Sequence, residues 1–177
     1  MPRSFDMSAD YEGTVEQVHR AFHDRDYWQG RLAETPVDIA TLESMRIGGE
    51  SGQDGTIEVV TVQTVCSNNL PGLVTQLHRG DLCVRREETW GPLRDDIATA
   101  SISGSIVNAP VNLWGTAVLE PVAETGGSRM TIQLTVQVRV PFIGGKLERL
   151  IGNELGQLVA IEQAFTTSFI SRSQQSP

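Results

Sequence analysis

Residues 141–170 read PFIGGKLERLIGNELGQLVAIEQAFTTSFI, and this stretch decides the fold, because a glycine-containing turn leads into a long segment with helical periodicity. At about 100° per residue, the large apolar side chains from residue 147 to about residue 170 fall into one stripe. The residues of this stripe are Leu147, Ile151, Leu155, Leu158, Phe165 and Phe169. Because a helix must bury such a stripe against another element, the sequence predicts a long C-terminal helix packed on the rest of the chain.

Glu162 and a line of small residues interrupt the pattern of this helix. Glu162 lies within the apolar stripe, where an unpaired buried carboxylate would be costly. It therefore either reaches solvent or pairs with an arginine, or it projects into a ligand cavity. Gly152, Gly156 and Ala160 follow one another at four-residue spacing, and each helical glycine costs about 1 kcal/mol relative to alanine. This line indicates close packing of a neighbouring element, or room for a ligand or a subunit contact.

Upstream of the helix the periodicity changes to two, which is typical of strands. The predicted strands cover residues 37–47, 57–66, 82–90, 97–106, 111–120 and 130–140, and an extended start near residues 4–7 makes about seven. Short turns between consecutive strands imply antiparallel pairing. Two short helices are expected between residues 10 and 36, the first with a capping box formed by Thr14 and Gln17. Residues 73–78 are ambiguous and fit a further short helix, so the segregated strands and helices indicate an α+β fold.

Length and composition limit the classes of protein that this chain fits. Its 177 residues suit a single domain, expected over residues 1–172 with a flexible polar tail at residues 173–177. A net charge of −8 without a basic stripe argues against nucleic-acid binding and against anionic membrane surfaces. No signal peptide and no membrane-spanning run is recognisable, so we expect a cytoplasmic protein without stable membrane insertion. Cys66 and Cys83 lack metal spacing and are interpreted as thiols in a reducing compartment, or as a pair meeting across adjacent strands.

No motif in the chain carries a recognisable chemistry. Phosphate-binding loops, dinucleotide fingerprints and nucleophile elbows are missing, so we predict no catalytic residue, no cofactor and no metal. His19 and His23 have a spacing that can hold a metal, but a solvated helix face is the preferred interpretation. His78 follows the turn at residues 71–72, near the expected mouth of a cavity. It could bind a ligand, act as an acid or base, or be an ordinary loop histidine.

The strand at residues 82–90 is the best source of a partner for Glu162. Because strand side chains alternate between faces, its even positions are expected to face inward; they are Leu82, Val84, Arg86, Glu88 and Trp90. Arg86 could then pair with Glu162 or with an acidic group of a ligand, or it could form a simple cross-strand or solvated charge. Trp28, Trp90 and Trp114 are large enough to line a pocket, and each also fits plain core or rim.

The order of elements, with the turn at residues 141–148 leading into the apolar helix, resembles the helix-grip fold of the START/SRPBCC superfamily. This superfamily includes lipid-transfer domains, plant hormone and pathogenesis-related proteins, and polyketide cyclases. The resemblance covers residues 3–170, and the turn is similar to one in an uncharacterised actinobacterial branch. It implies a curved sheet wrapped around the last helix with a cavity between them, and it carries over no catalytic residue.

The expected function is therefore the binding or transport of a small hydrophobic molecule, such as a lipid or a polyketide-like compound, by a monomer or homodimer. The residues expected to bind it are Arg86, Trp90, Trp114, Met130, Leu155, Leu158, Glu162, Phe165 and His78, with Met45, Val84 and Leu134 as further lining. One alternative is a cyclase or hydratase type of enzyme that uses His78 or Glu162 as acid or base. The other is an interaction module without a ligand.

Overall fold

The computed structural model describes residues 2–49 and 51–175. Strand β1 (Arg3–Tyr11) is followed by helices α1 (Val15–Ala21) and α2 (Arg25–Glu34), then by β2 (Ile39–Ile47) and β3 (Ile57–Val65). A 3₁₀ turn η1 (Ser67–Asn69) and helix α3 (Gly72–Leu77) precede β4 (Leu82–Trp90), β5 (Ala98–Ile106), β6 (Val111–Pro121) and β7 (Ser128–Val138). Helix α4 (Gly144–Gln175) ends the described chain. The ambiguous segment thus forms α3, and α4 extends into the expected tail, of which residues 176–177 lie outside the described residues.

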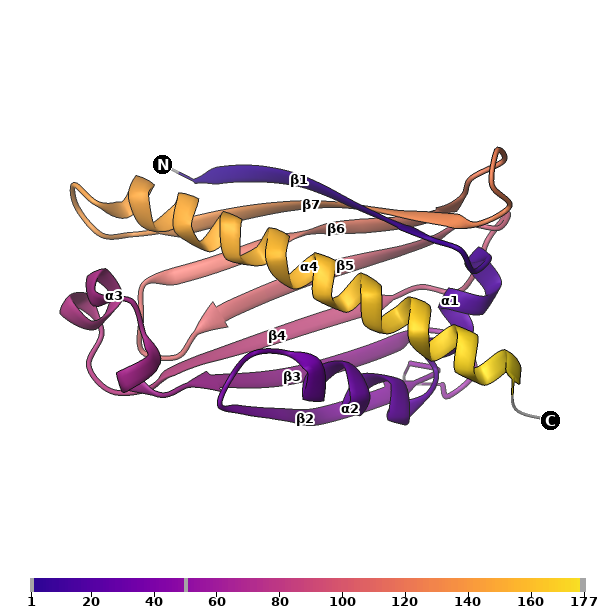
Figure 1. The fold of residues 1–177 in the computed structure, drawn as a ribbon, viewed down its shortest axis with the longest axis horizontal. Coiled ribbons are helices and arrows are strands. Elements are labelled where there is room, and N and C mark those ends of the chain that lie inside the picture. Colours follow the sequence, from indigo (N-terminus) through magenta and orange to yellow (C-terminus); the bar gives the residue numbers. More distant parts are fainter. Residues whose placement is uncertain (1, 50, 176–177) are drawn as a thin grey trace.

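The strands form one seven-stranded antiparallel sheet in the order β1-β7-β6-β5-β4-β3-β2. Figure 1 shows α4 running obliquely across one face of this sheet, with α3 at the end where α4 begins. Helices α1 and α2 contact α4 on the same side. The predicted α+β helix-grip fold, with a curved sheet around a long C-terminal helix, is confirmed.

Local signals place the two short helices. The capping box is confirmed: the Thr14 hydroxyl accepts a hydrogen bond from the Gln17 backbone N–H at 3.2 Å, and the Gln17 side chain accepts one from the Thr14 N–H at 2.8 Å. The Asp24 carboxylate accepts a hydrogen bond from the Asp26 N–H at 2.9 Å and so caps α2. These caps satisfy backbone donors that would otherwise be unpaired at the start of each helix.

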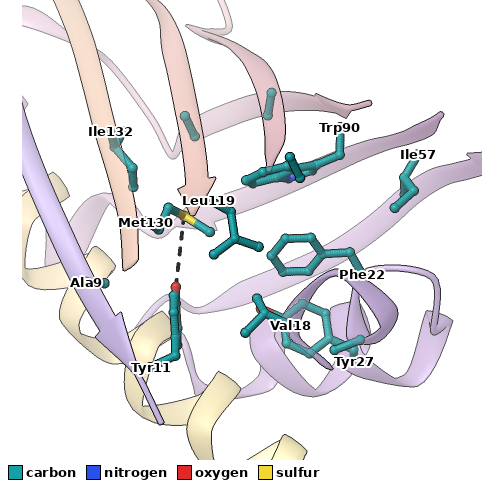
Figure 2. Packing of buried hydrophobic residues seen from close by; sticks show 14 of the residues in the cluster. Ala9, Tyr11, Val18, Phe22, Tyr27, Ile57, Trp90, Leu119, Met130 and Ile132 are labelled. Carbon is teal, nitrogen blue, oxygen red and sulfur yellow. Dashed lines mark hydrogen bonds between the residues drawn. The ribbon is translucent and has the colours of Figure 1, made fainter. Parts of the chain in front are cut away.

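A cluster of large side chains fills the end of the molecule where α1 and α2 lie (Figure 2). Phe22 lies at its centre, with ring centroids 4.8 Å from Trp90 and 5.7 Å from Trp28. Trp28 is fully buried, and its indole N–H donates to the Phe22 carbonyl at 2.8 Å. Trp28 is therefore core. This aromatic end of the domain holds the helices on the sheet through burial of large apolar surfaces.

The line of small residues on α4 has two different environments. A Cβ atom on Gly152 would lie only 2.2 Å from the ring of Phe5 on β1, whereas nothing lies within 4 Å of one on Gly156. Gly152 therefore allows β1 to pack closely on α4, as expected, while Gly156 faces open space. Helices α2 and α4 also pack closely, because a Cβ atom on Gly30 of α2 would lie 2.6 Å from the Phe165 ring of α4.

The prediction that His19 and His23 form a solvated helix face is wrong: His19 lies on α1, and His23 lies in the turn just after it. His19 is buried, and its Nε2 lies 2.9 Å from the Gly91 carbonyl oxygen. His23 packs edge-on against it, with ring centroids 5.0 Å apart. The helix turns His19 toward the strand end at residue 90, so the imidazole fills core space rather than facing water. Within residues 2–49 and 51–175 no cluster of three potential metal ligands exists.

We expect His19 to make the stability of the protein depend on pH. Burial lowers the pKa of His19 from its ordinary 6.5, although the hydrogen bond to Gly91 opposes this shift. The unfolded chain therefore binds the proton more readily, so the stability is fully present above about pH 6.5 and is lost as the pH falls through the lower folded value. Urea unfolding at several pH values measures this loss. A His19→Gln variant, which keeps an N–H donor, should show less of it, and an unchanged pH profile would contradict the assignment.

Candidate functional site: a cavity under the C-terminal helix

A cavity of about 510 Å³ lies between α4 and the sheet. Most of its lining is apolar and comes from strands β3 to β7, from α4 and from α3. The lining includes Val65, Val84, Ile102, Leu113, Ile132, Leu134, Ile151, Leu155, Leu158 and Val159. This volume lies within the range of roughly 300–1,000 Å³ that is usual for small-molecule sites.

The cavity has an open end and a closed end. Its exposed lining residues are Pro36, Asn69, Pro71 and Glu154, so the opening lies between η1, α3 and α4. Its buried lining residues include Tyr11, Phe22 and Trp90, which belong to the aromatic end of the domain. A molecule entering past α3 would therefore travel along β4 and α4 toward that end.

Four charged side chains stand at the inner part of the cavity. The predicted pair is present: Arg86 Nη1 and Nη2 donate to the two carboxylate oxygens of Glu162 at 2.8 and 3.2 Å. Arg86 also contacts Glu88, with Nη2 3.1 Å from Oε1. The inward orientation of the even positions on β4 is confirmed, because Arg86, Glu88 and Trp90 all line the cavity.

Arg31 on α2 is the fourth of these charged side chains, and the sequence analysis did not predict it. Its Nη2 lies 2.8 Å from Glu88 Oε2, its Nη1 lies 3.6 Å from Glu162 Oε2, and its guanidinium carbon lies 4.3 Å from the centre of the Trp28 ring. Each arginine thus contacts both glutamates, and the two positive and two negative charges balance. We call Arg31, Arg86, Glu88 and Glu162 the charge cluster.

Attraction to their partners keeps Glu88 and Arg31 charged. Burial alone would raise the pKa of Glu88, but Arg86 and Arg31 outweigh it and hold that pKa well below its usual range. Burial alone would lower the pKa of Arg31, but Glu162 and Glu88 outweigh it and raise that pKa. Glu88 and Arg31 are therefore fixed charges rather than proton donors or acceptors near neutral pH.

Some polar groups beside the cluster keep unused hydrogen-bonding capacity. Gln63 on β3 is 8% exposed and lines the cavity, and no hydrogen bond joins its side chain to another described residue. Gln63 pairs with Val84 across the β3–β4 ladder, one inward position from Arg86, which pairs with Thr61. Arg86 Nε and Trp90 Nε1 are buried donors without a partner among the described residues. Such groups are rare in folded proteins and mark places where a further partner can bind.

Six of the nine predicted binding residues line the cavity: Arg86, Trp90, Met130, Leu155, Leu158 and Glu162. Trp114 does not, and that expectation is wrong. It is 44% exposed because it occupies an outward position on β6, between Leu113 and Gly115. Phe165 is also outside the cavity lining: it is buried between α4 and α2, against Tyr27 and Gly30.

His78 does not line the cavity either, although α3 just before it does. Its Nε2 lies 3.0 Å from the Asp81 carbonyl oxygen, within the loop that leads to β4. Of the further predicted lining residues, Val84 and Leu134 are present, whereas Met45 packs against the core on β2. His78 and Glu162 therefore do not converge as an acid–base pair inside the cavity.

Two remaining expectations have simple outcomes. Cys66 and Cys83 are both free and half-buried. Among the helices of the described chain, none combines the length and the apolar character needed to cross a membrane.

An antiparallel sheet that closes on one long helix over a ligand-sized cavity defines the helix-grip class. The Zhui aromatase/cyclase from Streptomyces sp. R1128 shares this fold, with a TM-score of 0.63 and 7% identity over 99% of this chain and 98% of that chain. The di-domain ARO/CYC StfQ from the steffimycin biosynthetic pathway has a TM-score of 0.63 and 10% identity, covering 99% of this chain and 53% of that chain. At these identities the likeness shows the fold alone.

The chain belongs to the DUF2505 family, described as a protein of unknown function, which it matches over residues 6–170. The uncharacterized protein Rv0481c of Mycobacterium tuberculosis is 76% identical over 173 residues, which cover 98% of this chain and 99% of that relative. The predicted helix-grip fold is thus shared with these solved structures, and the mycobacterial relative agrees with the predicted actinobacterial branch.

Proposed function

We propose that this protein binds a small, mostly apolar molecule in the cavity under α4. The observation that carries the proposal is the cavity of about 510 Å³ with a mainly apolar lining, open at one end and closed at the other by the aromatic end of the domain. An apolar void of this size forfeits dispersion contacts, which an apolar occupant would restore. A lipid or a polyketide-like compound fits this description.

The polar end of the ligand would lie against Gln63 and the charge cluster. Because the cluster is already neutral, a carboxylate on the ligand would bring a third anion beside Glu88 and Glu162. A neutral carbonyl or hydroxyl group avoids this repulsion and can hydrogen-bond to the Gln63 amide, which both donates and accepts. The favoured ligand is therefore an uncharged molecule with one polar end rather than a fatty acid.

The alternative of a cyclase or hydratase loses its proposed acid and base. Glu162 is held between Arg86 and Arg31, and His78 bonds to a loop carbonyl outside the cavity lining. General acid–base catalysis needs a titratable group within reach of the substrate. The geometry of these two residues favours binding over this route of catalysis.

A pair of phenylalanine substitutions tests the cavity. Val84 lines it from β4, whereas Val62 is an outward residue on the neighbouring strand β3. We expect the neutral dye Nile red to bind the wild type with increased fluorescence, and Val84→Phe to weaken this binding about tenfold, because the added ring occupies ligand volume and costs roughly 1.4 kcal/mol of affinity. The measurement is a fluorescence titration.

Val62→Phe is the control, since it adds the same ring outside the cavity. Melting temperatures of both variants show whether each one folds. Equal dye affinities for folded Val84→Phe and Val62→Phe would refute binding in this cavity. Native mass spectrometry of protein purified from its own host then identifies the natural occupant.

A further inference from the structure

The loop between β7 and α4 presents an apolar side chain to solvent. Phe142 is fully exposed, and its backbone φ of 67° lies in the left-handed region that non-glycine residues seldom adopt. Hydrogen bonds hold this conformation: the Ile143 N–H donates to the Pro141 carbonyl at 2.8 Å, and the Gly144 N–H to the Val140 carbonyl at 3.1 Å. The fold thus maintains a strained turn that points a large apolar group outward, and strain of this kind often accompanies function.

The exposed charged residues nearest to Phe142 in the sequence are all positive. Arg139, Lys146 and Arg149 are exposed, and none of them forms an ion pair with another described residue. The one acidic residue in this stretch, Glu148, is buried and accepts a hydrogen bond from the Val138 N–H at 2.9 Å. We call Arg139, Phe142, Lys146 and Arg149 the cationic corner. It contrasts with the net charge of −8 on the whole chain.

The cationic corner adjoins the opening of the cavity. Val140 and Ile143 of the loop pack in one apolar cluster with Leu73 of α3. The next residue of α3, Val74, lines the cavity near its exposed end, as do Leu150 and Ile151 one turn beyond Lys146 and Leu147. Figure 1 shows this loop and α3 at the same end of the molecule.

We propose that the cationic corner docks reversibly on an anionic lipid bilayer. Phe142 inserts its ring at the interface, and Arg139, Lys146 and Arg149 lie against the anionic headgroups. Charges more than about 8 Å away are largely screened at physiological salt, so the local positive charge rather than the net charge governs the contact. Docking brings the opening beside α3 to the membrane surface, where apolar molecules are concentrated.

Vesicle sedimentation tests the proposal with the full chain. The wild type should sediment with vesicles of phosphatidylcholine and phosphatidylglycerol, less so at high salt, and should not sediment with phosphatidylcholine alone. Phe142→Gly should lower the partition coefficient about tenfold, because it removes the inserted apolar ring. Arg149→Glu should lower it about thirtyfold, because it replaces a cation with an anion near an anionic surface, a change of about 2 kcal/mol. Glycine tolerates the left-handed turn, so the first variant should fold.

Two variants elsewhere serve as controls. Trp114→Ala removes an exposed aromatic ring from the outward face of β6, and Arg25→Glu reverses an exposed cation at the start of α2; both should sediment like the wild type. The proposal would be overturned if the wild type did not sediment with anionic vesicles. It would also be overturned if the variants of the cationic corner sedimented as well as the controls. Nile red binding by the corner variants should be unchanged, so this outcome is independent of whether the cavity binds a ligand.

Discussion

Replacing Glu88 with glutamine is expected to lower the free energy of unfolding by about 3–5 kcal/mol, because it removes one anion from a buried network of four charges. Arg31 and Arg86 would then share the single carboxylate of Glu162, and each would lose a charge-assisted contact of 2.8 or 3.1 Å. Chemical unfolding measures the change. For a domain of this length we expect a fall of about 10 °C in melting temperature.

Glu87→Gln is the matched control, because Glu87 is the next residue on β4 and faces outward. Its contact is with Arg85 on the exposed face, and exposed pairs contribute little, about 0–1 kcal/mol. The two variants make the same chemical change one position apart on the strand. Similar small losses from both would show that the charge cluster does not stabilise the fold.

Alanine at Gly152 and at Gly156 should change stability in opposite directions. Gly152→Ala gains about 1 kcal/mol of helix propensity, but its Cβ would lie 2.2 Å from the Phe5 ring. Displacing that ring costs about 1–3 kcal/mol of overpacking, so the net effect is a loss. Gly156→Ala meets nothing within 4 Å and should raise the free energy of unfolding by about 1 kcal/mol. Urea unfolding of the two variants measures both changes.

This pair tests the contact between β1 and α4. A second substitution, Phe5→Leu, should relieve Gly152→Ala, since a shorter side chain makes room for the methyl group. If alanine stabilised the protein at both positions, α4 would not approach β1 as closely as the structure places it.

Period and turns were enough to predict the α+β class, and the resemblance to the START/SRPBCC superfamily supplied the helix-grip arrangement. The stripe from Leu147 to Phe169 requires a surface to cover, and strands joined by short turns supply one antiparallel sheet. The alternation on β4 also predicts the inward position of Arg86, and the carboxylate in the stripe of α4 predicts its partner. These inferences succeed because each depends on which face of one element a residue occupies.

Such reasoning did not place four residues correctly: Arg31, Trp114, Phe165 and His78. Arg31 was missed because its partners lie on β4 and α4, far away in the sequence, although two inward glutamates with one inward arginine already implied a missing cation. Trp114 was misplaced because its size was given more weight than its outward position on β6. Phe165 shares the stripe but meets α2 instead of the cavity, and this depends on where α2 crosses α4.

The charge cluster lies between two parts of the interior that differ in how tightly they are packed. On one side, tightly packed aromatic rings around Phe22 carry the stability of the domain. On the other side, aliphatic residues such as Val84 and Leu158 border the cavity and lie outside the clusters of buried apolar residues. Substitutions on the second side should therefore change the shape of the cavity while the chain stays folded. Under the proposed function, related proteins could then bind different ligands with the same fold.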